Sequence, residues 1–360
     1  MKKIRIGLVG CRRGKSIVTV FAAHPDAQVT ALCDIDPVKL QEAGKALGLP
    51  DSALFTDYVA FINSPMDAVI IATPIKFHAD QTLQALAAGK HVLCEQTVAY
   101  TVKDCQRVVD AVKKSDRTYM MGENYCYFHY VREWQKLVNA GKLGKIYYAE
   151  GEYIHEIIDL LVDAKTGQYF WRHERPPIWY CAHTLGPLLT LMDDRIVKAC
   201  GLTTGFNKMP DYKDHLGFLD FEIGLFKTQK GSVIKILRSQ VAARPHMVWY
   251  SLYGTNGHVE NGRFDKLSSD GLLHIEGEMD KHKPQTTSYP VIDPNAPEEA
   301  KKGGHGTSEY FMIRDFLQAV QTGSKPPIDV IKATDMTIPG LIAHESAMQG
   351  GKWLDVPLMG

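Results

Sequence analysis

The chain has 360 residues, 45% of them hydrophobic and 23% charged, which is ordinary globular composition and enough length for about two domains. Its 41 Lys and Arg residues balance 41 Asp and Glu residues, so no overall basicity recruits nucleic acid or an anionic membrane. The seven cysteines lack CxxC spacing, and no apolar run reaches the ~18 residues of a membrane span. We therefore expect reduced thiols and a cytoplasmic protein without a signal peptide, unless a leader was removed.

Strand-like and helix-like segments alternate over the first third of the chain, as in a parallel sheet with crossover helices. Asp36 is expected to cap a helix that begins at Pro37. The other expected elements are strands at 4–9, 29–34, 67–73, 91–95 and 118–124, and helices at 14–23 and 77–89. These segments predict an α/β Rossmann domain, with a doubly wound parallel sheet, over residues 1–122.

The pattern then changes, because strand-like runs follow one another with turns such as Thr255-Asn256-Gly257 between them. The expected elements are helices at 130–144, 308–322 and 331–349, a loop at 280–306, and strands at 146–157 and in the runs VKACGLTT, HLGFLDFEIG, SVIKILRSQVA and MVWYSLYG. Consecutive strands indicate an open, mostly antiparallel sheet. We expect an α+β domain for substrate and oligomerisation over 123–330, with a C-terminal helix and tail, 331–360, at the domain junction.

The turn after the first strand reads GLVGCRRGK and resembles a degraded dinucleotide fingerprint. Gly10 fits the first glycine, Arg12 stands at the second, and Gly14 lies one residue before the usual third. Asp34 ends the next strand, where a carboxylate accepts ribose hydroxyls and repels a 2′-phosphate, so NAD is favoured over NADP. Plain turn glycines are the alternative.

Three basic residues of this turn, Arg12, Arg13 and Lys15, are expected to contact the pyrophosphate. Contact with a 2′-phosphate by an unusual route is the alternative. Glu95 ends another expected strand at the cofactor edge, where the nicotinamide ribose would lie; a local helix-capping carboxylate is the alternative for this residue.

The segments GCRRG, LCDID, IIATPIKFHAD, GKHVLCEQTVA and MMGENYCYFHY occur in the order typical of the glucose–fructose oxidoreductase, inositol dehydrogenase and rhizopine catabolism (Gfo/Idh/MocA) family. This resemblance covers nearly the whole chain and implies a Rossmann domain followed by an open-sheet domain that faces the nicotinamide and a sugar or cyclitol. The cofactor-binding residues expected in addition to Gly10, Arg12, Arg13, Gly14, Asp34 and Glu95 are Thr73, Pro74, His78, Gln96, Asn124, Trp171 and Arg172. Trp171 and Arg172 could instead stack on a sugar or hold its hydroxyl or carboxylate, or simply anchor a packed loop.

The second half of the chain resembles one branch of this family, the NAD-dependent glycosidases typified by bacterial α-N-acetylgalactosaminidase. The segments that carry this resemblance are MGENYCYFHY, AEGEYIHEI, WYCAHTLGP and GGHGTSEYFMIRDFLQAV. The resemblance implies tightly bound NAD and a redox-neutral cycle: oxidation at the sugar C3, elimination of the C1 substituent, addition of water and return of the hydride. The usual Lys-Pro after Glu95 is replaced by Gln96-Thr97, and loss of this lysine fits the glycosidase branch.

Four residues match sugar-binding and catalytic positions of that branch: Glu123, Tyr153, Tyr180 and His183. A later tyrosine is implied as well, and Tyr250 and Tyr253 are both candidates. The segment RPPIW replaces a Gly-Asn before the Tyr…His motif, so the resemblance does not imply N-acetylgalactosamine as the sugar.

Strand alternation adds His155 to this catalytic set, because Tyr153 and His155 share one face of a strand while Glu152, Ile154 and Glu156 share the other. His183 at a helix N-terminus is expected to be a neutral base for the C3 hydroxyl, and Tyr153 is expected to take the C2 proton. The alternatives are a sheet aromatic for Tyr153, a capping or core histidine for His183 and a solvated loop carboxylate for Glu123.

A metal site made by Glu123, His155 and His183 is a weaker alternative, and we expect no metal. His215 and His305 are further loose candidates, and His305 lies in a GGHGT loop that could close over a site.

Two other functions stay open: a plain NAD-dependent sugar or cyclitol dehydrogenase with net NADH formation, and a non-catalytic NAD-binding paralogue. The expected partners are a sugar or glycoside and further copies of the chain, as a dimer or tetramer, with no nucleic acid and no membrane.

Overall fold

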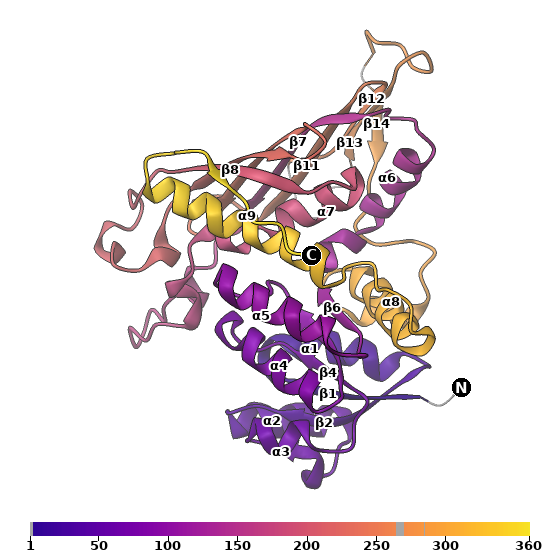
Figure 1. Ribbon diagram of the computed structural model, residues 1–360, viewed down its shortest axis with the longest axis vertical. Helices are drawn as coiled ribbons and strands as arrows, with labels where there is room; N and C mark the ends of the chain where they lie inside the picture. The colour runs from indigo at the N-terminus through magenta and orange to yellow at the C-terminus, as the bar shows by residue number, and fades with distance from the viewer. Residues whose placement is uncertain (1–2, 264–269, 284) are drawn as a thin grey trace. The chain divides into compact units, whose positions relative to one another are not determined.

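The computed structural model describes residues 3–263, 270–283 and 285–360, and its chain divides into two compact units (Figure 1). The first unit comprises Met1–Phe128, Ile292–Thr334 and Met359–Gly360, and the second comprises His129–Val291 and Asp335–Leu358. The segment 292–330, which the sequence placed with the second domain, belongs to the first unit because its helix packs on the helix that follows the first strand.

The first unit is built on six parallel strands in the order β3-β2-β1-β4-β5-β6. The strands are β1 (Ile4–Val9), β2 (Ala27–Cys33), β3 (Leu54–Phe55), β4 (Ala68–Ile71), β5 (His91–Glu95) and β6 (Tyr119–Gly122). The order reverses between β1 and β4, which is the topological switch point of a Rossmann fold. The predicted doubly wound domain is confirmed.

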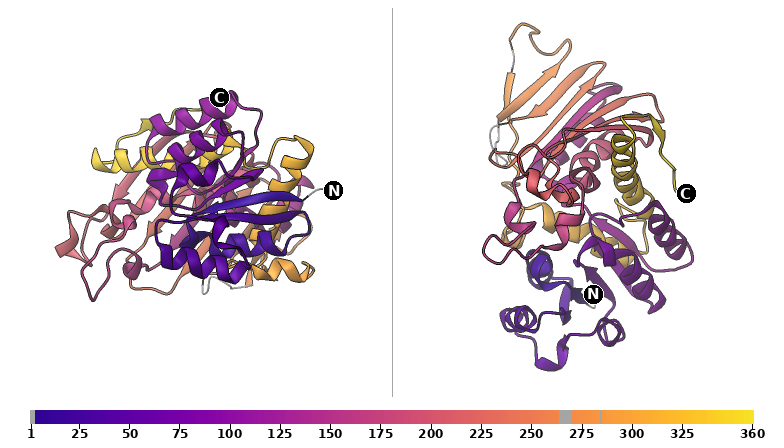
Figure 2. Two further views of the ribbon diagram at one scale, coloured as in Figure 1. Left: turned by 90° about the horizontal axis from the view of Figure 1, so that it is seen from below. Right: turned by 90° about the vertical axis from the view of Figure 1, so that its left-hand side faces the viewer.

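Helices cover both faces of this sheet (Figure 2, left). They are α1 (Cys11–Ala23), α2 (Pro37–Leu47), α3 (Tyr58–Ile62), α4 (His78–Ala87), α5 (Val102–Lys113) and α8 (Ser308–Thr322). Asp36 caps α2 as predicted, since its carboxylate accepts from the N–H groups of Val38 and Lys39. The first helix begins at Cys11 rather than at Gly14, because Gly10 already makes the turn.

The second unit is built on a nine-stranded sheet in the order β14-β13-β12-β11-β7-β10-β9-β8-β15. The strands are β7 (Ile146–Ile154), β8 (Ile196–Thr203), β9 (Glu222–Thr228), β10 (Val233–Ser239), β11 (Met247–Gly254), β12 (Gly257–Asn261), β13 (Asp270–Ile275), β14 (Gln285–Ser288) and β15 (Leu354–Asp355). The described pairs are antiparallel except β7 with β10, which confirms the mostly antiparallel sheet. The segment 280–306 is not a plain loop as predicted, because it contains β14 and a 3-10 helix at Glu298–Lys302.

Helices cover one face of this sheet (Figure 2, right): α6 (His129–Asn139), α7 (Ala182–Met192) and α9 (Val330–Met348), of which the part from Asp335 belongs to this unit. Alternation along β7 turns Gly151 and Tyr153 toward α7, and Glu150 and Glu152 toward the other face. A Cβ on Gly151 would lie 3.1 Å from the carbonyl oxygen of Thr184. Glycine at this position therefore lets the first turn of α7 approach the strand that carries Tyr153.

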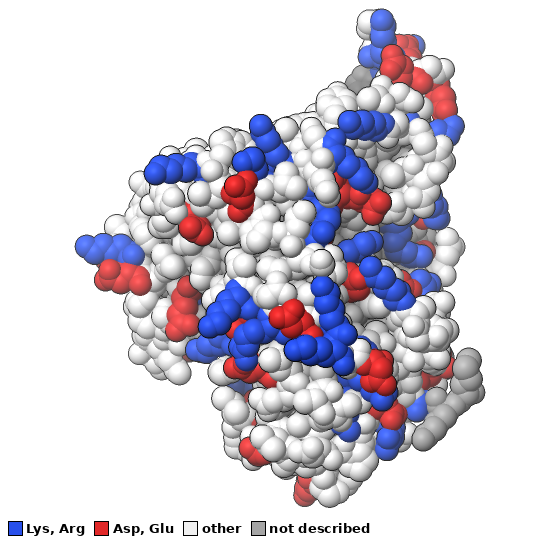
Figure 3. All heavy atoms as spheres, in the orientation of Figure 1, with Lys and Arg blue, Asp and Glu red and all other residues white. Residues whose placement is uncertain are grey.

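Basic and acidic side chains are interspersed over the face shown in Figure 3, in keeping with the balanced charge of the chain. Within the described ranges, no helix is both long enough and apolar enough to cross a membrane.

Candidate functional site

The turn between β1 and α1 requires a glycine at position 10. Gly10 has φ 94°, the left-handed conformation that glycine adopts without strain, and a Cβ at this position would lie 2.5 Å from the carbonyl oxygen of Ala72. The Cys11 N–H donates to Asp34 Oδ2 at 2.7 Å, and the Asp36 N–H donates to Asp34 Oδ1 at 2.9 Å. The predicted ribose carboxylate is thus oriented by two backbone groups at the carboxyl end of β2.

Arg13 is held by two carboxylates and a serine, and its predicted contact with the pyrophosphate stays a prediction. Its guanidinium lies 2.8 Å from Glu95 Oε1 at the end of β5 and 3.8 Å from Glu309 Oε1 in the first turn of α8, and it donates to Ser16 Oγ at 3.0 Å. Arg13 therefore orders the carboxylate expected at the nicotinamide ribose, while Arg12 is exposed on the same turn.

The GGHG segment is held to the same group of charges. Glu309 Oε2 accepts from the Gly304 N–H at 2.6 Å, and Glu309 Oε1 lies 3.0 Å from His305 Nδ1 and accepts from Ser16 Oγ at 3.2 Å. His305 is thus tied to α8 and α1 by Glu309, a residue that sequence reasoning did not single out. The signal was a carboxylate four residues after a histidine, at the start of an expected helix.

Two carboxyls of this group have pKa values shifted in opposite directions. Burial raises the pKa of Glu95, and the neighbouring Glu309 and Glu123 carboxylates add to the rise, against the charges of Arg13 and His305. Burial would also raise the pKa of Glu309, but the hydrogen bond from His305, the charges of His305 and Arg13 and the Gly304 N–H outweigh it and lower the pKa. A proton added to the pair therefore goes to Glu95, which can then donate a hydrogen bond as well as accept one.

The other predicted cofactor residues of this unit lie at the carboxyl ends of β4, β5 and β6. His78 joins two of these ends, because its ring nitrogens lie 2.8 Å from the carbonyl oxygens of Thr73 and Thr97. Burial lowers the pKa of His78, and the two backbone hydrogen bonds only partly oppose this effect. Pro74 precedes the short helix Ile75–Phe77, and Gln96 is buried directly after Glu95.

Glu123 and Asn124 follow β6 and are both buried. Glu123 Oε1 accepts from the Tyr125 N–H at 3.1 Å, so this residue is not a solvated loop carboxylate. The Asn124 amide makes no hydrogen bond to any described residue, and a buried polar group of this kind normally has a partner. Together with the glycine turn at Gly10 and the oriented Asp34 carboxylate, this amide fits a dinucleotide on this edge of the sheet.

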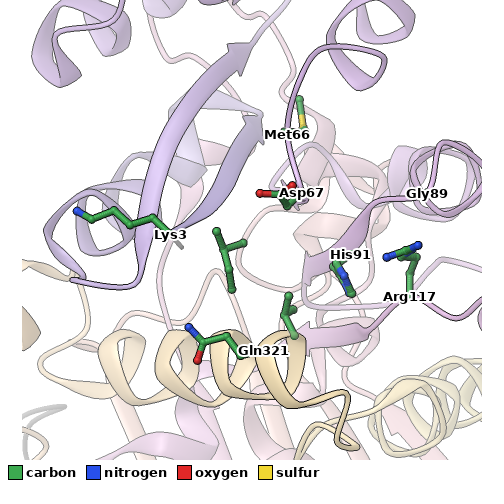
Figure 4. A pocket seen from close by; sticks show the side chains of 9 residues that line it. Lys3, Met66, Asp67, Gly89, His91, Arg117 and Gln321 are labelled. Carbon is green, nitrogen blue, oxygen red and sulfur yellow. The ribbon is translucent and has the colours of Figure 1, made fainter. Parts of the chain in front are cut away.

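A pocket of about 370 Å³ lies at the other edge of the same sheet (Figure 4). Lys3, Asp67, His91 and Arg117 line it, where β1, β4 and β5 begin, together with Gln321 of α8. Ligands of doubly wound sheets bind beyond the carboxyl ends of the strands, so this pocket is separate from the cofactor edge.

The second unit brings together four of the predicted catalytic residues. Tyr153 Oη lies 2.8 Å from Nδ1 of His155, which directly follows β7, so the two side chains lie on the same side as predicted. The His183 ring lies 5.4 Å from the Tyr153 ring and 5.0 Å from the Tyr180 ring, centroid to centroid. His183 is in the first turn of α7, as expected, and the Tyr250 hydroxyl donates to its carbonyl oxygen.

That hydrogen bond distinguishes the two candidates for the later tyrosine. Tyr250 is fully buried and lies on the α7 side of β11. Tyr253 packs on Tyr148 and His258 on the opposite face of the sheet.

Three residues that sequence reasoning missed adjoin this cluster. His246, just before β11, stacks on His155 with ring centroids 3.9 Å apart and lies 5.2 Å from the Tyr153 ring. The Arg238 guanidinium lies 4.1 Å from the Tyr153 ring centroid, and the Arg175 guanidinium lies 4.2 Å from that of Tyr180. The signal for Arg238 was a charged residue at an inward position of the apolar run SVIKILRS, in step with Ile234 and Ile236.

Trp171 and Arg172 belong to this second unit, in the 3-10 helix Trp171–Glu174, where the Arg172 guanidinium lies over the Trp171 ring at 4.4 Å. Their role at the cofactor stays a prediction. His215 lies 3.0 Å from His173, nitrogen to nitrogen, beside Tyr169. Over the described part of the chain, no group of three or more His, Cys, Asp or Glu side chains is arranged to hold a metal ion.

Comparison with known proteins gives two family matches that together span nearly the whole chain. Residues 4–123 match an oxidoreductase family with an NAD-binding Rossmann fold, Gfo/Idh/MocA, and residues 127–359 match the C-terminal domain of glycosyl hydrolase 109. A glycosyl hydrolase family 109 protein of Solibacter usitatus is 27% identical over 96% of this chain and 86% of its own length. Another from Shewanella pealeana is 26% identical over 99% of this chain and 85% of its own length.

Solved structures share the fold at lower identity. A levoglucosan dehydrogenase in complex with NADH and L-sorbose is 18% identical with a TM-score of 0.84, and the similarity covers all of both chains. An inositol dehydrogenase homologue from Azotobacter vinelandii, in complex with NADH and myo-inositol, is 20% identical with a TM-score of 0.79 over 98% of each chain.

The left-handed conformation and close packing of Gly10 give a first prediction. Gly10→Ala places a Cβ against Ala72 in a left-handed conformation, and we expect it to lower the NAD content of the purified protein. The control is Gly48→Ala, which has φ 67° and nothing within 4 Å of the added Cβ. It should lose about 1 kcal/mol of stability but keep its NAD. Equal NAD content in both variants, measured after denaturation, would contradict the assignment of this turn.

The Arg13–Glu95 pair gives a second prediction. Arg13→Met leaves the buried Glu95 carboxylate without its cation, so the free energy of unfolding should fall by about 1–3 kcal/mol. Removing the cation raises the pKa of Glu95 further, so Glu95 is protonated at low pH. The loss should therefore be smaller at about pH 5 than at about pH 8. Arg12→Met, which removes an exposed charge, should change stability by about 0.5 kcal/mol or less. Chemical unfolding at both pH values tests this, and equal losses in the two variants would refute it.

Proposed function

The chain belongs to glycosyl hydrolase family 109, with the NAD-binding Rossmann domain of Gfo/Idh/MocA oxidoreductases, and from this premise we propose that it cleaves glycosides in a redox-neutral cycle. In that cycle the C3 hydroxyl of the sugar is oxidised, the C2 proton and the C1 substituent are eliminated, water adds to the resulting enone, and C3 is reduced again. The enzyme is NAD-dependent and acts on a sugar; the order of these steps is the proposal.

Bound NAD would supply the acceptor, and later the donor, of the C3 hydride. We assign its binding to the first unit: backbone at Gly10, Arg12 and Gly14 for the pyrophosphate, and Asp34 for the adenosine ribose. Glu95, ordered by Arg13, would hold the nicotinamide ribose, and the buried Asn124 amide would complete the site. Thr73, Pro74, His78 and Gln96 would shape the same edge of the sheet. A cofactor that is reoxidised on the enzyme has no need to leave, so we expect it to be tightly bound.

The second unit supplies the proton-transfer groups in this proposal. His183, at the N-terminus of α7, would accept the C3 hydroxyl proton as a neutral imidazole. Tyr153 would remove the C2 proton, with His155 as its hydrogen-bond partner. Tyr180, packed edge-on against His183, would orient the sugar. Glu123, which belongs to the first unit, is assigned a separate sugar-binding role.

One observation carries the proposal: the buried Tyr153 and His183 and the half-buried His155 lie together on one face of the sheet, in a chain with Gln96 in place of the dehydrogenase lysine. Abstraction of a C2 proton calls for its own base, and this cluster offers a phenol and two imidazoles. A simple dehydrogenase needs only a base for the hydroxyl, which the missing lysine would have provided.

The experiment uses purified protein without added cofactor and a panel of p-nitrophenyl glycosides. We expect NAD to be released on denaturation, and nitrophenol to form from at least one glycoside without net NADH absorbance. Stoichiometric NADH without nitrophenol would instead establish a dehydrogenase, and absence of both NAD and turnover would favour a non-catalytic paralogue.

Variants separate the roles of the cluster. Tyr153→Phe and His183→Ala should each lower kcat by about 10²- to 10⁴-fold, the usual contribution of an acid or base. Tyr148→Phe is the matched control, because Tyr148 lies on the same strand with its side chain on the other face. Full activity of His183→Ala would contradict the assignment of His183 as the base for the C3 hydroxyl.

We also propose that the chain forms a homo-oligomer through the helix-free face of its nine-stranded sheet and works in the cytoplasm. Apolar side chains on that face are exposed, among them Leu202, Leu225, Val233 and Tyr253. Large apolar sheet faces are rarely left in water. Light scattering at micromolar concentration should give a dimer or tetramer, and Leu225→Glu should shift it to the monomer; a wild-type monomer would contradict the proposal.

A further inference from the structure

Arg238 is a buried cation on the face of the sheet that carries Tyr153. It stands opposite Tyr153 in the parallel pair β7–β10, and opposite Glu222 in the antiparallel pair β9–β10. Its relative exposure is 2%, so a sugar cannot reach it as a direct ligand. Its effect on the reaction must therefore pass through the side chains that it touches.

The guanidinium is fixed against aromatic rings. It lies 4.1 Å from the Tyr153 ring centroid and 5.6 Å from that of Tyr180, and its Nε donates to the Pro177 carbonyl at 3.3 Å. A cation over a ring face is attracted by the ring and more strongly by a ring that carries a negative charge, and this attraction is large where water is excluded. Arginine keeps its charge at any pH at which the protein is folded.

Three imidazoles also lie near Tyr153. His155 lies 2.8 Å from the phenol oxygen, while the rings of His183 and His246 lie 5.4 Å and 5.2 Å from the Tyr153 ring. Near Arg238, the Arg175 guanidinium lies against Tyr180. The carboxylate of Glu222 accepts from the Ile178 N–H at 2.8 Å and lies 2.7 Å from His344 Nδ1.

We propose that Arg238 is a positioning residue that stabilises the ionised form of Tyr153, so that this tyrosine can act as the base for the C2 proton. The phenol O–H bond breaks and its proton passes to the lone pair of His155 Nδ1, which leaves a phenolate between two cations. The phenolate then takes the proton from C2. The C2–H electron pair forms the C1=C2 bond, and the C1–O bond breaks with its electrons on the leaving oxygen. This assignment rests on the proposed function. It adds Arg238 as the group that allows Tyr153 to remove the C2 proton.

The first test is the pH profile of nitrophenol release. Arg238→Met removes the charge but keeps a long apolar chain, and we expect the acid limb of kcat to move up by about one pH unit or more. Activity near neutral pH would fall about tenfold for each pH unit by which the acid limb moves, and it would recover at high pH. Arg238→Lys keeps a cation and should restore much of the shift. The control is Arg263→Met, because Arg263 lies 3.7 Å over the Trp249 ring in the same sheet but on the face that carries Glu152.

The second test does not depend on catalysis. The absorbance of tyrosinate near ~295 nm is followed during a pH titration of the wild type and of Tyr153→Phe, and the difference between the two curves isolates Tyr153. The same difference is measured for Arg238→Met and Arg238→Met/Tyr153→Phe. We expect its midpoint to rise by about one unit or more when Arg238 is lost.

The outcomes separate this proposal from the proposed function. A raised midpoint supports the role of Arg238 even if no glycoside is cleaved, in which case the proposed function fails alone. An unchanged midpoint in folded Arg238→Met overturns the role even if glycosides are cleaved. If Arg238→Met does not fold, Arg238→Lys and Arg238→Gln are titrated, and equal midpoints in these two variants overturn it as well.

Discussion

A charged side chain inside a protein is tolerated only when its surroundings replace the water that it has lost, and both units meet this requirement at their predicted sites. In the first unit, Arg13 lies between Glu95 and Glu309 and so connects the first turn of α1, the end of β5 and the start of α8. These elements are far apart in the sequence, and the shared charge fixes their relative positions. One guanidinium thus joins three of the elements that form the predicted cofactor edge.

The second unit compensates its buried charge differently. Arg238 and Arg175 lie over the faces of Tyr153 and Tyr180, and ring faces stabilise a cation without accepting its protons. An arginine paired with a carboxylate has most of its field cancelled. An arginine that also lies against a phenol acts on a group that can become negative. The same contact that stabilises the buried guanidinium can therefore also favour ionisation of the tyrosine.

Local patterns in the sequence predicted much of this structure. Apolar runs located the strands of the first sheet, the Asp36-Pro37 pair located the start of α2, and the two-residue period of a strand placed Tyr153 and His155 together. The contacts that could not be predicted join residues distant in the chain, such as Arg13 with Glu309 and Arg238 with Tyr153. Sheet order and register determine those contacts, and a single segment carries no information about either.

The replacement of lysine by Gln96 is consistent with this distribution of charge. A flexible lysine ammonium serves as an acid and base because it gains and loses a proton, and this suits removal of a hydroxyl proton. A guanidinium keeps its proton, so Arg238 can act only by stabilising a negative charge on a neighbour. Elimination requires a base strong enough to remove a proton from carbon. A fixed cation beside a tyrosine helps to generate such a base, because it stabilises the phenolate. The chain lacks the lysine that would deprotonate a hydroxyl, and it buries Arg238, which can support deprotonation of a carbon. This contrast favours glycoside cleavage over simple oxidation.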